Sequence, residues 1–222
     1  MSANHAAFNL IFRFVENYIS PIAGRISSQR HVMAIRDGFI SAMPFMIVGS
    51  FLLVFAYPPF SPDTTWGFAR AWLDLAKEFE GRILTPFDMT MGIMSIYICA
   101  AISYNLGKHY EKSNQLDPFM CAMLSIMAFL LIAAPKTNGT LPVDSLGGTG
   151  IFTAILVAIY CVEMMRFLKA HNIGIRLPDQ VPPMIKNSFD LLIPVLVVVL
   201  TLYPLSLFIQ HHFDMLIPQA IM

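Results

Sequence analysis

The sequence predicts an all-α fold, a polytopic bundle of membrane-spanning helices, from three observations. Hydrophobic residues make up 56% of the 222 residues and charged residues only 13%, about half the charged share that soluble domains usually carry. The mean hydropathy is +0.64. Five long runs contain no Asp, Glu, Lys or Arg, and each has the length that a helix needs to cross a bilayer core about 30 Å thick.

The five uncharged runs predict five strong spans, at residues 38–57, 89–106, 118–135, 146–162 and 191–209. Upstream of them, residues 8–27 have apolar positions at helical spacing but also carry Arg13, Glu16 and Arg25. This segment forms either a helix on the membrane surface or a sixth, N-terminal span whose charges the bundle neutralises.

Residues 66–82 predict an amphipathic helix between the first two runs. Its apolar side chains, Trp66 and Trp72 among them, fall largely on one face, while most of its charged side chains take the other. Tryptophan favours the headgroup layer of a bilayer. We therefore expect this helix to lie parallel to the membrane plane.

The distribution of basic residues leaves the sidedness of the loops open. If only the five strong runs cross, one side of the membrane carries ten Lys and Arg residues and the other side four. The positive-inside rule then places the N-terminus in the cytoplasm. If residues 8–27 cross as well and the N-terminus stays cytoplasmic, every later loop changes side and the count runs against the rule.

The composition argues against several classes of function. The formal net charge is zero, whereas nucleic-acid-binding proteins carry a basic stripe. Cys99, Cys121 and Cys161 lie inside apolar runs without ligand spacing and are interpreted as small hydrophobic side chains. No metal-ligand spacing and no nucleophile motif is present. We expect no metal site, no cofactor and no catalytic residue in this chain.

Two carboxylates near the ends of spans have expected structural roles. Glu163 and Arg166 are one helical turn apart and are expected to form an ion pair. Asp88 follows Pro86 and is expected to start a helix, since Asp is favoured at helix N-termini.

Residues 174–190 combine charges with Pro178, Pro182 and Pro183. Each proline stops a helix from continuing through it and favours extended geometry in the residue before it. Asp190 is then a favourable N-cap for the last apolar run. The segment is either a semi-rigid linker, or hinge, between two membrane-embedded units (1–173 and 191–222) or an ordinary loop between helices.

Three blocks of sequence, in order, resemble one family. They are "VENYISPIAGRISSQRHVMAIRDGFISAMPFMIVGSFLLV", then "APKTNGTLP" followed by "LGGTGIFTAILVAIYCVE", and finally "RLPDQVPPMIKNSFDLLIP". All three are similar to the sugar-specific Enzyme IIC, or permease, component of bacterial phosphotransferase systems, in its lactose/cellobiose/diacetylchitobiose branch. The resemblance runs from about residue 12 to residue 222.

The resemblance implies a homodimeric, multi-pass sugar transporter of the bacterial cytoplasmic (inner) membrane, in contact with membrane lipid. It implies that a disaccharide is translocated and phosphorylated with the help of cytoplasmic Enzyme IIA and IIB phospho-carriers. In the family, a first half with five spans and a membrane-parallel helix makes much of the dimer contact. A proline-containing linker leads to a second half, which carries the re-entrant hairpins, the sugar site and the phosphotransfer His and Glu. By this comparison residues 8–27 are the first span.

One loop of this chain is a candidate for sugar contact. The resemblance implies that the loop carrying Lys136, Thr137, Asn138 and Gly139 dips toward the sugar pocket. The Asn138 amide offers both a donor and an acceptor to a sugar hydroxyl, and Gly139 permits tight backbone geometry. The alternative is a plain Asn-Gly turn.

Members of the family are roughly twice as long as this chain, so residues 191–222 are expected to be only the start of the second half. The expected function is therefore that of the N-terminal half of a phosphotransferase-system sugar permease. The alternative is a non-catalytic membrane dimerisation or scaffold module that results from truncation or a split gene.

Overall fold

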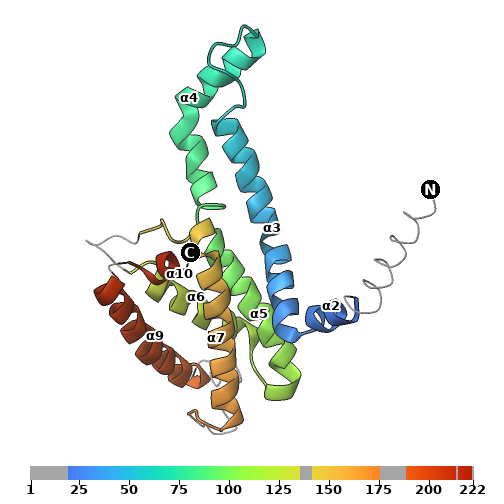
Figure 1. Ribbon diagram of the computed structural model, residues 1–222, viewed down its shortest axis with the longest axis vertical. Helices are drawn as coiled ribbons and strands as arrows, with labels where there is room; N and C mark the ends of the chain where they lie inside the picture. Colours follow the sequence, from blue (N-terminus) through green and yellow to red (C-terminus); the bar gives the residue numbers. More distant parts are fainter. Residues whose placement is uncertain (1–19, 136–141, 176–188, 214, 222) are drawn as a thin grey trace, which may run out of the picture.

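The computed structural model describes residues 20–135, 142–175, 189–213 and 215–221. Every regular element in these ranges is helical, which confirms the predicted all-α class (Figure 1). In chain order the elements are α2 (Ser20–Ser27), α3 (Arg30–Ala56), α4 (Gly67–Asp88), α5 (Met94–Asn114), α6 (Pro118–Ala133), the 3₁₀ turn η2 (Gly148–Gly150), α7 (Ile151–Ala170), α9 (Leu192–Phe213) and α10 (Ile217–Ile221).

Each of the five uncharged runs lies largely within a helix, in the order α3, α5, α6, α7 and α9. Within the described ranges, three helical stretches are long and apolar enough to cross a membrane: Arg30–Ala56, Gly148–Ala170 and Leu192–Phe213. The helix Pro118–Ala133 is apolar but shorter, and α5 carries charged side chains in its last turns. The helices are confirmed, whereas the number of crossings stays a prediction. Most of the proposed sixth span, residues 8–27, lies outside the described residues.

The amphipathic segment 66–82 is helical, as predicted, and forms most of α4. Figure 1 shows α3 and α4 side by side, as a hairpin that projects beyond the other helices. On α4, Ala69 and Ala76 are buried, and the Trp72 indole N–H donates to the carbonyl oxygen of Phe55, 3.2 Å away. Because α4 runs along α3, it can lie in the membrane plane only if this part of α3 does so too. The orientation of α4 to the membrane stays a prediction.

The expected role of Asp88 was wrong. Asp88 ends α4 instead of starting a helix, and Pro86 lies inside the last turn of α4. A proline fixes φ at a helical value and removes one backbone donor, so near the end of an established helix it can be accommodated. The next helix, α5, begins only at Met94, after a turn.

Helix α5 is the centre of the bundle and packs against α3, α6 and α7. Its buried face comprises Ser95, Ile98, Cys99, Ile102, Ser103, Leu106, Gly107 and Tyr110. Residues without bulk let the neighbouring helices approach α5 closely: Gly38 of α3 lies directly on Ile102, and Gly107 of α5 lies on Cys121 and Pro118 of α6. Helix association in membranes depends on such close packing, because lipid tails are as apolar as the side chains.

The three cysteines belong to this core. Cys99, Cys121 and Cys161 are all free and 0% exposed. The Cys99 thiol points at the Ser125 carbonyl oxygen, 3.5 Å from its sulfur. Their interpretation as small buried side chains is confirmed.

Candidate functional site

The residues that the sequence singled out for sugar contact and for the hinge lie outside the described residues. These are Lys136, Thr137, Asn138 and Gly139 in the loop, and Pro178, Pro182 and Pro183 in the linker. The structure does describe the chain on both sides of each segment. The geometry of those flanking residues shows how the two segments are attached to the bundle.

Buried residues lie near residues 136–141 on both sides, although Val143 and Asp144 on the α7 side are exposed. On the α6 side, Ala133 and Ala134 are 0% and 2% exposed, and on the α7 side Ser145 and Leu146 are each 4% exposed. On the α7 side, Leu146 is bonded to the first turn of α5. The Ser95 backbone N–H donates to the carbonyl oxygen of Leu146 at 3.0 Å. Both attachments of the loop are therefore fixed to the bundle core.

Segment 142–150 is folded compactly before α7 begins. The Thr149 hydroxyl donates to the carbonyl oxygen of Asp144 at 3.0 Å. At Gly150 a side chain has no room, because a Cβ would overlap the Ser145 carbonyl oxygen and would lie 2.9 Å from the Ser95 hydroxyl oxygen. Only glycine fits here, and this requirement fixes the path of the segment into α7.

The short helix α10 packs on this same end of the bundle. It contacts α6, η2 and α7, and its Ile217 and Pro218 are buried. Figure 1 shows α10 beside the segment that leads into α7. The last described helix therefore lies next to both attachments of the loop that carries Lys136–Gly139.

At the opposite end of the bundle, Glu163 joins three helices. Its Oε1 accepts a hydrogen bond from the Tyr110 hydroxyl at 2.7 Å and lies 3.0 Å from His31 Nε2. Its Oε2 accepts from the guanidinium of Arg166 at 2.8 Å. The expected Glu163–Arg166 pair is confirmed, and the carboxylate also bonds to side chains from α3 and α5.

The ring of Tyr110 is the inner part of this cluster. Tyr110 is 2% exposed, and the guanidinium carbons of Arg166 and Arg30 lie 4.7 and 5.5 Å from the centre of its ring. Cations over an aromatic face are attracted by the negative face of the ring. Glu163, Tyr110 and these cationic side chains connect α3, α5 and α7, an arrangement that suits a structural clamp at the start of α3.

Sequence reasoning did not find His31 and Tyr110 as partners of Glu163. They are separated from it by 132 and 53 positions, so no local spacing reports the contact. The i,i+3 spacing of Glu163 and Arg166 is the part of the cluster that a sequence can show.

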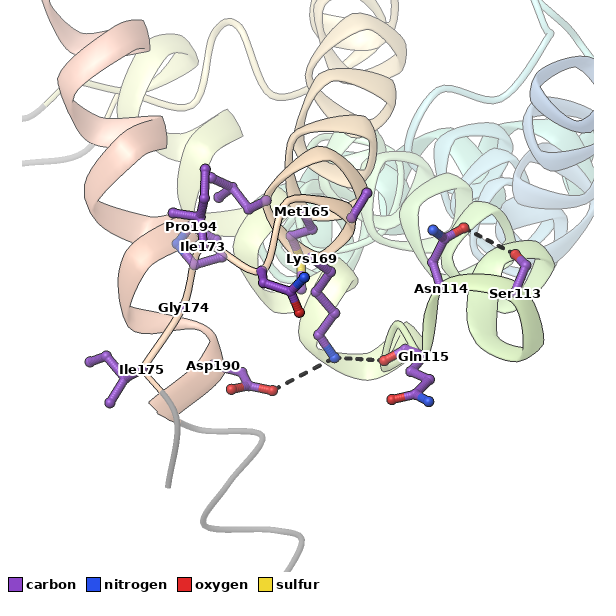
Figure 2. Close-up of a pocket in the computed structure, with 13 residues that line it drawn as sticks. Ser113, Asn114, Gln115, Met165, Lys169, Ile173, Gly174, Ile175, Asp190 and Pro194 are labelled. Atoms are coloured by element: carbon purple, nitrogen blue, oxygen red, sulfur yellow. Dashed lines mark hydrogen bonds and ion pairs between the residues drawn. The ribbon is translucent and has the colours of Figure 1, made fainter. Parts of the chain in front are cut away.

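A cavity of about 510 Å³ lies at the same end, between the α5–α6 turn, the end of α7 and the start of α9 (Figure 2). The side chain of Lys169 in α7 extends toward the α5–α6 turn and toward the chain before α9. Its ammonium donates to the Gln115 carbonyl oxygen at 2.6 Å and lies 3.6 Å from the Asp190 carboxylate. Ile175, directly before the undescribed residues 176–188, and Asp190, two positions after them, both line the cavity. Lys169 thus holds the α5–α6 turn and the chain before α9 in one place.

Replacing Glu163 by Gln tests whether the cluster is a clamp. Gln removes the charge that pairs with the part-exposed Arg166 and leaves the buried Tyr110 hydroxyl without an ionised partner, so we expect a loss of about 1–3 kcal/mol in stability. Thermal unfolding of the detergent-solubilised protein measures it. Asp37→Asn is the matched control: Asp37 pairs with its neighbour Arg36 at the surface, and the expected change is below about 0.5 kcal/mol. Equal effects of the two substitutions would contradict the clamp.

Comparison with known proteins gives one consistent family. Residues 36–221 match the family model "Phosphotransferase system, EIIC". The chain is 35% identical over 206 residues to the cellobiose-specific EIIC component of Geobacillus stearothermophilus, covering 84% of this chain and 43% of the relative. It is 31% identical over 206 residues to the lactose-specific EIICB component of Lactococcus lactis, covering 90% of this chain and 35% of the relative.

A solved structure agrees with the sequence comparisons. The crystal structure of ChbC, the IIC component of the N,N'-diacetylchitobiose-specific phosphotransferase system, superposes with a TM-score of 0.77 at 32% identity, covering 94% of this chain and 50% of that one. The chain thus spans about half the length, or less, of the proteins it matches. Its apolar helices fit a multi-pass protein of the bacterial cytoplasmic membrane. The chain belongs to the EIIC family of the phosphotransferase system.

Proposed function

We propose that this chain is the first half of a permease that moves a disaccharide across the cytoplasmic membrane and couples the movement to phosphorylation of the sugar. The observation that carries the proposal is the match of nearly the whole chain to proteins named for cellobiose, lactose and N,N'-diacetylchitobiose. All three of these sugars are disaccharides. The residues that distinguish among them, and the phosphotransfer groups, are assigned to the second half.

The proposed partners follow from the same family. The sugar is phosphorylated by cytoplasmic Enzyme IIA and IIB phospho-carriers, and the permease works as a homodimer in the lipid bilayer. Fusion of the IIC and IIB units in the lactose-specific relatives, which carry the name EIICB, supports a IIB unit as a partner. Phosphate transfer from these carriers to cellobiose in membranes that contain the protein would test the coupling, and sugar uptake without phosphorylation would contradict it.

The proposed sugar contact is the loop at Lys136, Thr137, Asn138 and Gly139. Two observations support it. Ala134 before the loop and Ser145 and Leu146 after it are buried, so the chain is anchored in the bundle on both sides of the loop. Helix α10, which follows α9 in the part of the chain assigned to the second half, packs next to these residues. A loop placed there can reach a sugar that the second half binds.

Asn138→Ala tests this contact in the protein at the full length that its gene encodes. The amide is expected to bond to a sugar hydroxyl, and its loss leaves that group unpaired, so sugar binding should weaken by about 1–3 kcal/mol. Calorimetric titration with cellobiose, lactose and N,N'-diacetylchitobiose measures the effect. Asn105→Ala is the control, because the Asn105 amide bonds within its own helix, to the Ala101 carbonyl oxygen.

An unchanged dissociation constant for Asn138→Ala would show that the loop is an ordinary Asn-Gly turn. No binding of any of the three sugars by the unsubstituted protein would contradict the permease and favour a non-catalytic scaffold.

We also propose that residues 174–190 form a hinge between the two halves, with Pro178, Pro182 and Pro183 keeping it stiff. The cavity beside Lys169 supports this proposal. The chain leaves the bundle at one of its walls and returns at another, and the contact between Lys169 and Asp190 is a single ion pair of 3.6 Å. Motion at such a joint changes rates more than it changes affinity.

Replacing Pro182 and Pro183 together by Ala should slow sugar uptake and leave the dissociation constant within about threefold, or about 0.7 kcal/mol. Transport and equilibrium binding are measured on the same variant. Pro58 and Pro59, an adjacent pair in the turn after α3, replaced together by Ala are the control and should leave uptake unchanged. Normal uptake in the Pro182/Pro183 variant, or loss of binding with uptake, would rule out the hinge.

A further inference from the structure

Helix α9 is joined to α7 by two polar contacts between side chains. Near the end of α7, the Lys169 ammonium lies 3.6 Å from the carboxylate of Asp190, which precedes α9. Near the middle of both helices, the hydroxyl oxygens of Tyr160 on α7 and Thr201 on α9 lie 2.6 Å apart. The two helices are therefore linked at two heights of the bundle.

The two contacts agree with a single antiparallel register. Figure 1 shows α7 and α9 running in opposite directions. Nine positions separate Tyr160 from Lys169, and eleven separate Asp190 from Thr201, which are about 14 and 17 Å at the rise of a helix. Because the spacings match, both contacts form together. A slide of α9 along α7 by one turn, about 5.4 Å, would separate both pairs at once.

The Tyr160 hydroxyl is the donor in its contact with Thr201. The Thr201 hydroxyl donates within its own helix, where its oxygen lies 2.8 Å from the Val197 carbonyl oxygen and 3.1 Å from that of Val198. A hydroxyl has only one proton to donate, so Tyr160 supplies the proton between the helices. When this contact opens, Thr201 keeps its own bond, and only the Tyr160 hydroxyl has to find another partner.

The buried stripe of α9 does not select the register by itself. It consists of Pro194, Val198, Leu202 and Ser206, and the one polar member, Ser206, bonds to Gln210 of the same helix. An apolar stripe can pack at more than one position along a neighbouring helix, because lipid tails are as apolar as its side chains. The two polar contacts therefore determine where α9 rests on α7.

We propose that the Tyr160–Thr201 and Lys169–Asp190 contacts form a latch: they hold α9 in one register on α7, and both open when the second half moves relative to the first. This inference rests on the proposed function, in which α9 belongs to the moving half. Each contact is one hydrogen bond or one ion pair, and interactions between helices of this kind are modest in membranes. The latch can therefore define a resting position and still release during transport.

A covalent link across the latch tests whether it has to open. Tyr160 and Thr201 are both replaced by Cys in the full-length protein and joined by a short, reducible bifunctional thiol reagent. The linked protein should bind cellobiose, lactose or N,N'-diacetylchitobiose with a dissociation constant within about threefold of that of the unlinked protein. Its uptake of the sugar should fall to below about a tenth, because the movement that limits transport is blocked. Reduction of the link should restore uptake.

A Cys pair at positions 57 and 80 is the matched control. The Tyr57 hydroxyl donates to the Glu80 carboxylate at 2.9 Å, so this pair also connects neighbouring elements, the end of α3 and α4, through side chains. Both residues lie in the first half, and a link between them should leave uptake within about twofold, since it does not cross between the halves. The three native cysteines of this chain are 0% exposed and should not react with the reagent.

Tyr160→Phe combined with Asp190→Asn tests the register without a link. Spin labels at the exposed positions Phe152 on α7 and Leu192 on α9 report how far the helices are displaced along each other. Without the latch, the distribution of label distances should broaden by up to about 5 Å, one helical turn. Tyr203→Phe, at an exposed tyrosine of α9, is the control and should leave the distribution unchanged.

The possible results separate the latch from the proposed function. Normal uptake by the linked protein would overturn the latch and leave the permease standing. Loss of sugar binding on linking would also overturn it, since the contacts would then belong to the binding site's own fold. An unchanged distance distribution without the two contacts would show that other interactions set the register, and this measurement decides if the Cys variant does not fold. If the unsubstituted protein takes up none of the three sugars, the permease is wrong and the latch falls with it.

Discussion

The close approach of neighbouring helices to α5 fixes the positions of the other helices in the bundle. At three levels a glycine allows the approach: Gly38 of α3 against Ile102, Gly107 of α5 against Cys121 and Pro118, and Gly150 before α7, where a Cβ would lie 2.9 Å from the Ser95 hydroxyl oxygen. Packing inside a protein is dense and has few ways to relax, and in a membrane it replaces the hydrophobic effect as the main force between helices. The position of α5 therefore sets those of α3, α6 and the start of α7, and through them both ends of the bundle.

The two ends of this bundle have different features. At one end Glu163 binds side chains from α3, α5 and α7, and Lys169 reaches the chain before α9. At the other end segment 142–150 is held by Ser95 and lies against α10. In the proposed permease the first end anchors the hinge and the second end carries the sugar loop. Helix α9 itself is attached along a narrow buried stripe of Pro194, Val198, Leu202 and Ser206, a limited contact that suits the first helix of a moving half.

Sequence patterns predicted the parts of the fold that depend on local chemistry. Runs without charge identified the helices, and the spacing of Glu163 and Arg166 identified an ion pair, since both follow from residues close in the chain. The contacts of Glu163 with His31 and Tyr110, and those of Ser95 with Leu146 and Gly147, join distant segments and left no local signal. Asp88 was misplaced because a proline at the end of a helix was interpreted as the start of one. The sugar loop and the hinge were assigned by resemblance and stay proposals.

Helices α3 and α5 touch at Gly38, where a side chain has no room. Unfolding of Gly38→Ala and Gly81→Ala, measured side by side in detergent, tests this contact. A Cβ at position 38 would lie 2.9 Å from the backbone nitrogen of Ile102, and we expect a loss of about 1–3 kcal/mol. At position 81, also within a helix, a Cβ would have no atom within 4 Å beyond its chain neighbours and the backbone of its own helix. Alanine there should stabilise the protein by up to about 1 kcal/mol. A Gly38→Ala protein as stable as the Gly81→Ala protein would contradict the close contact of α3 and α5 at Gly38.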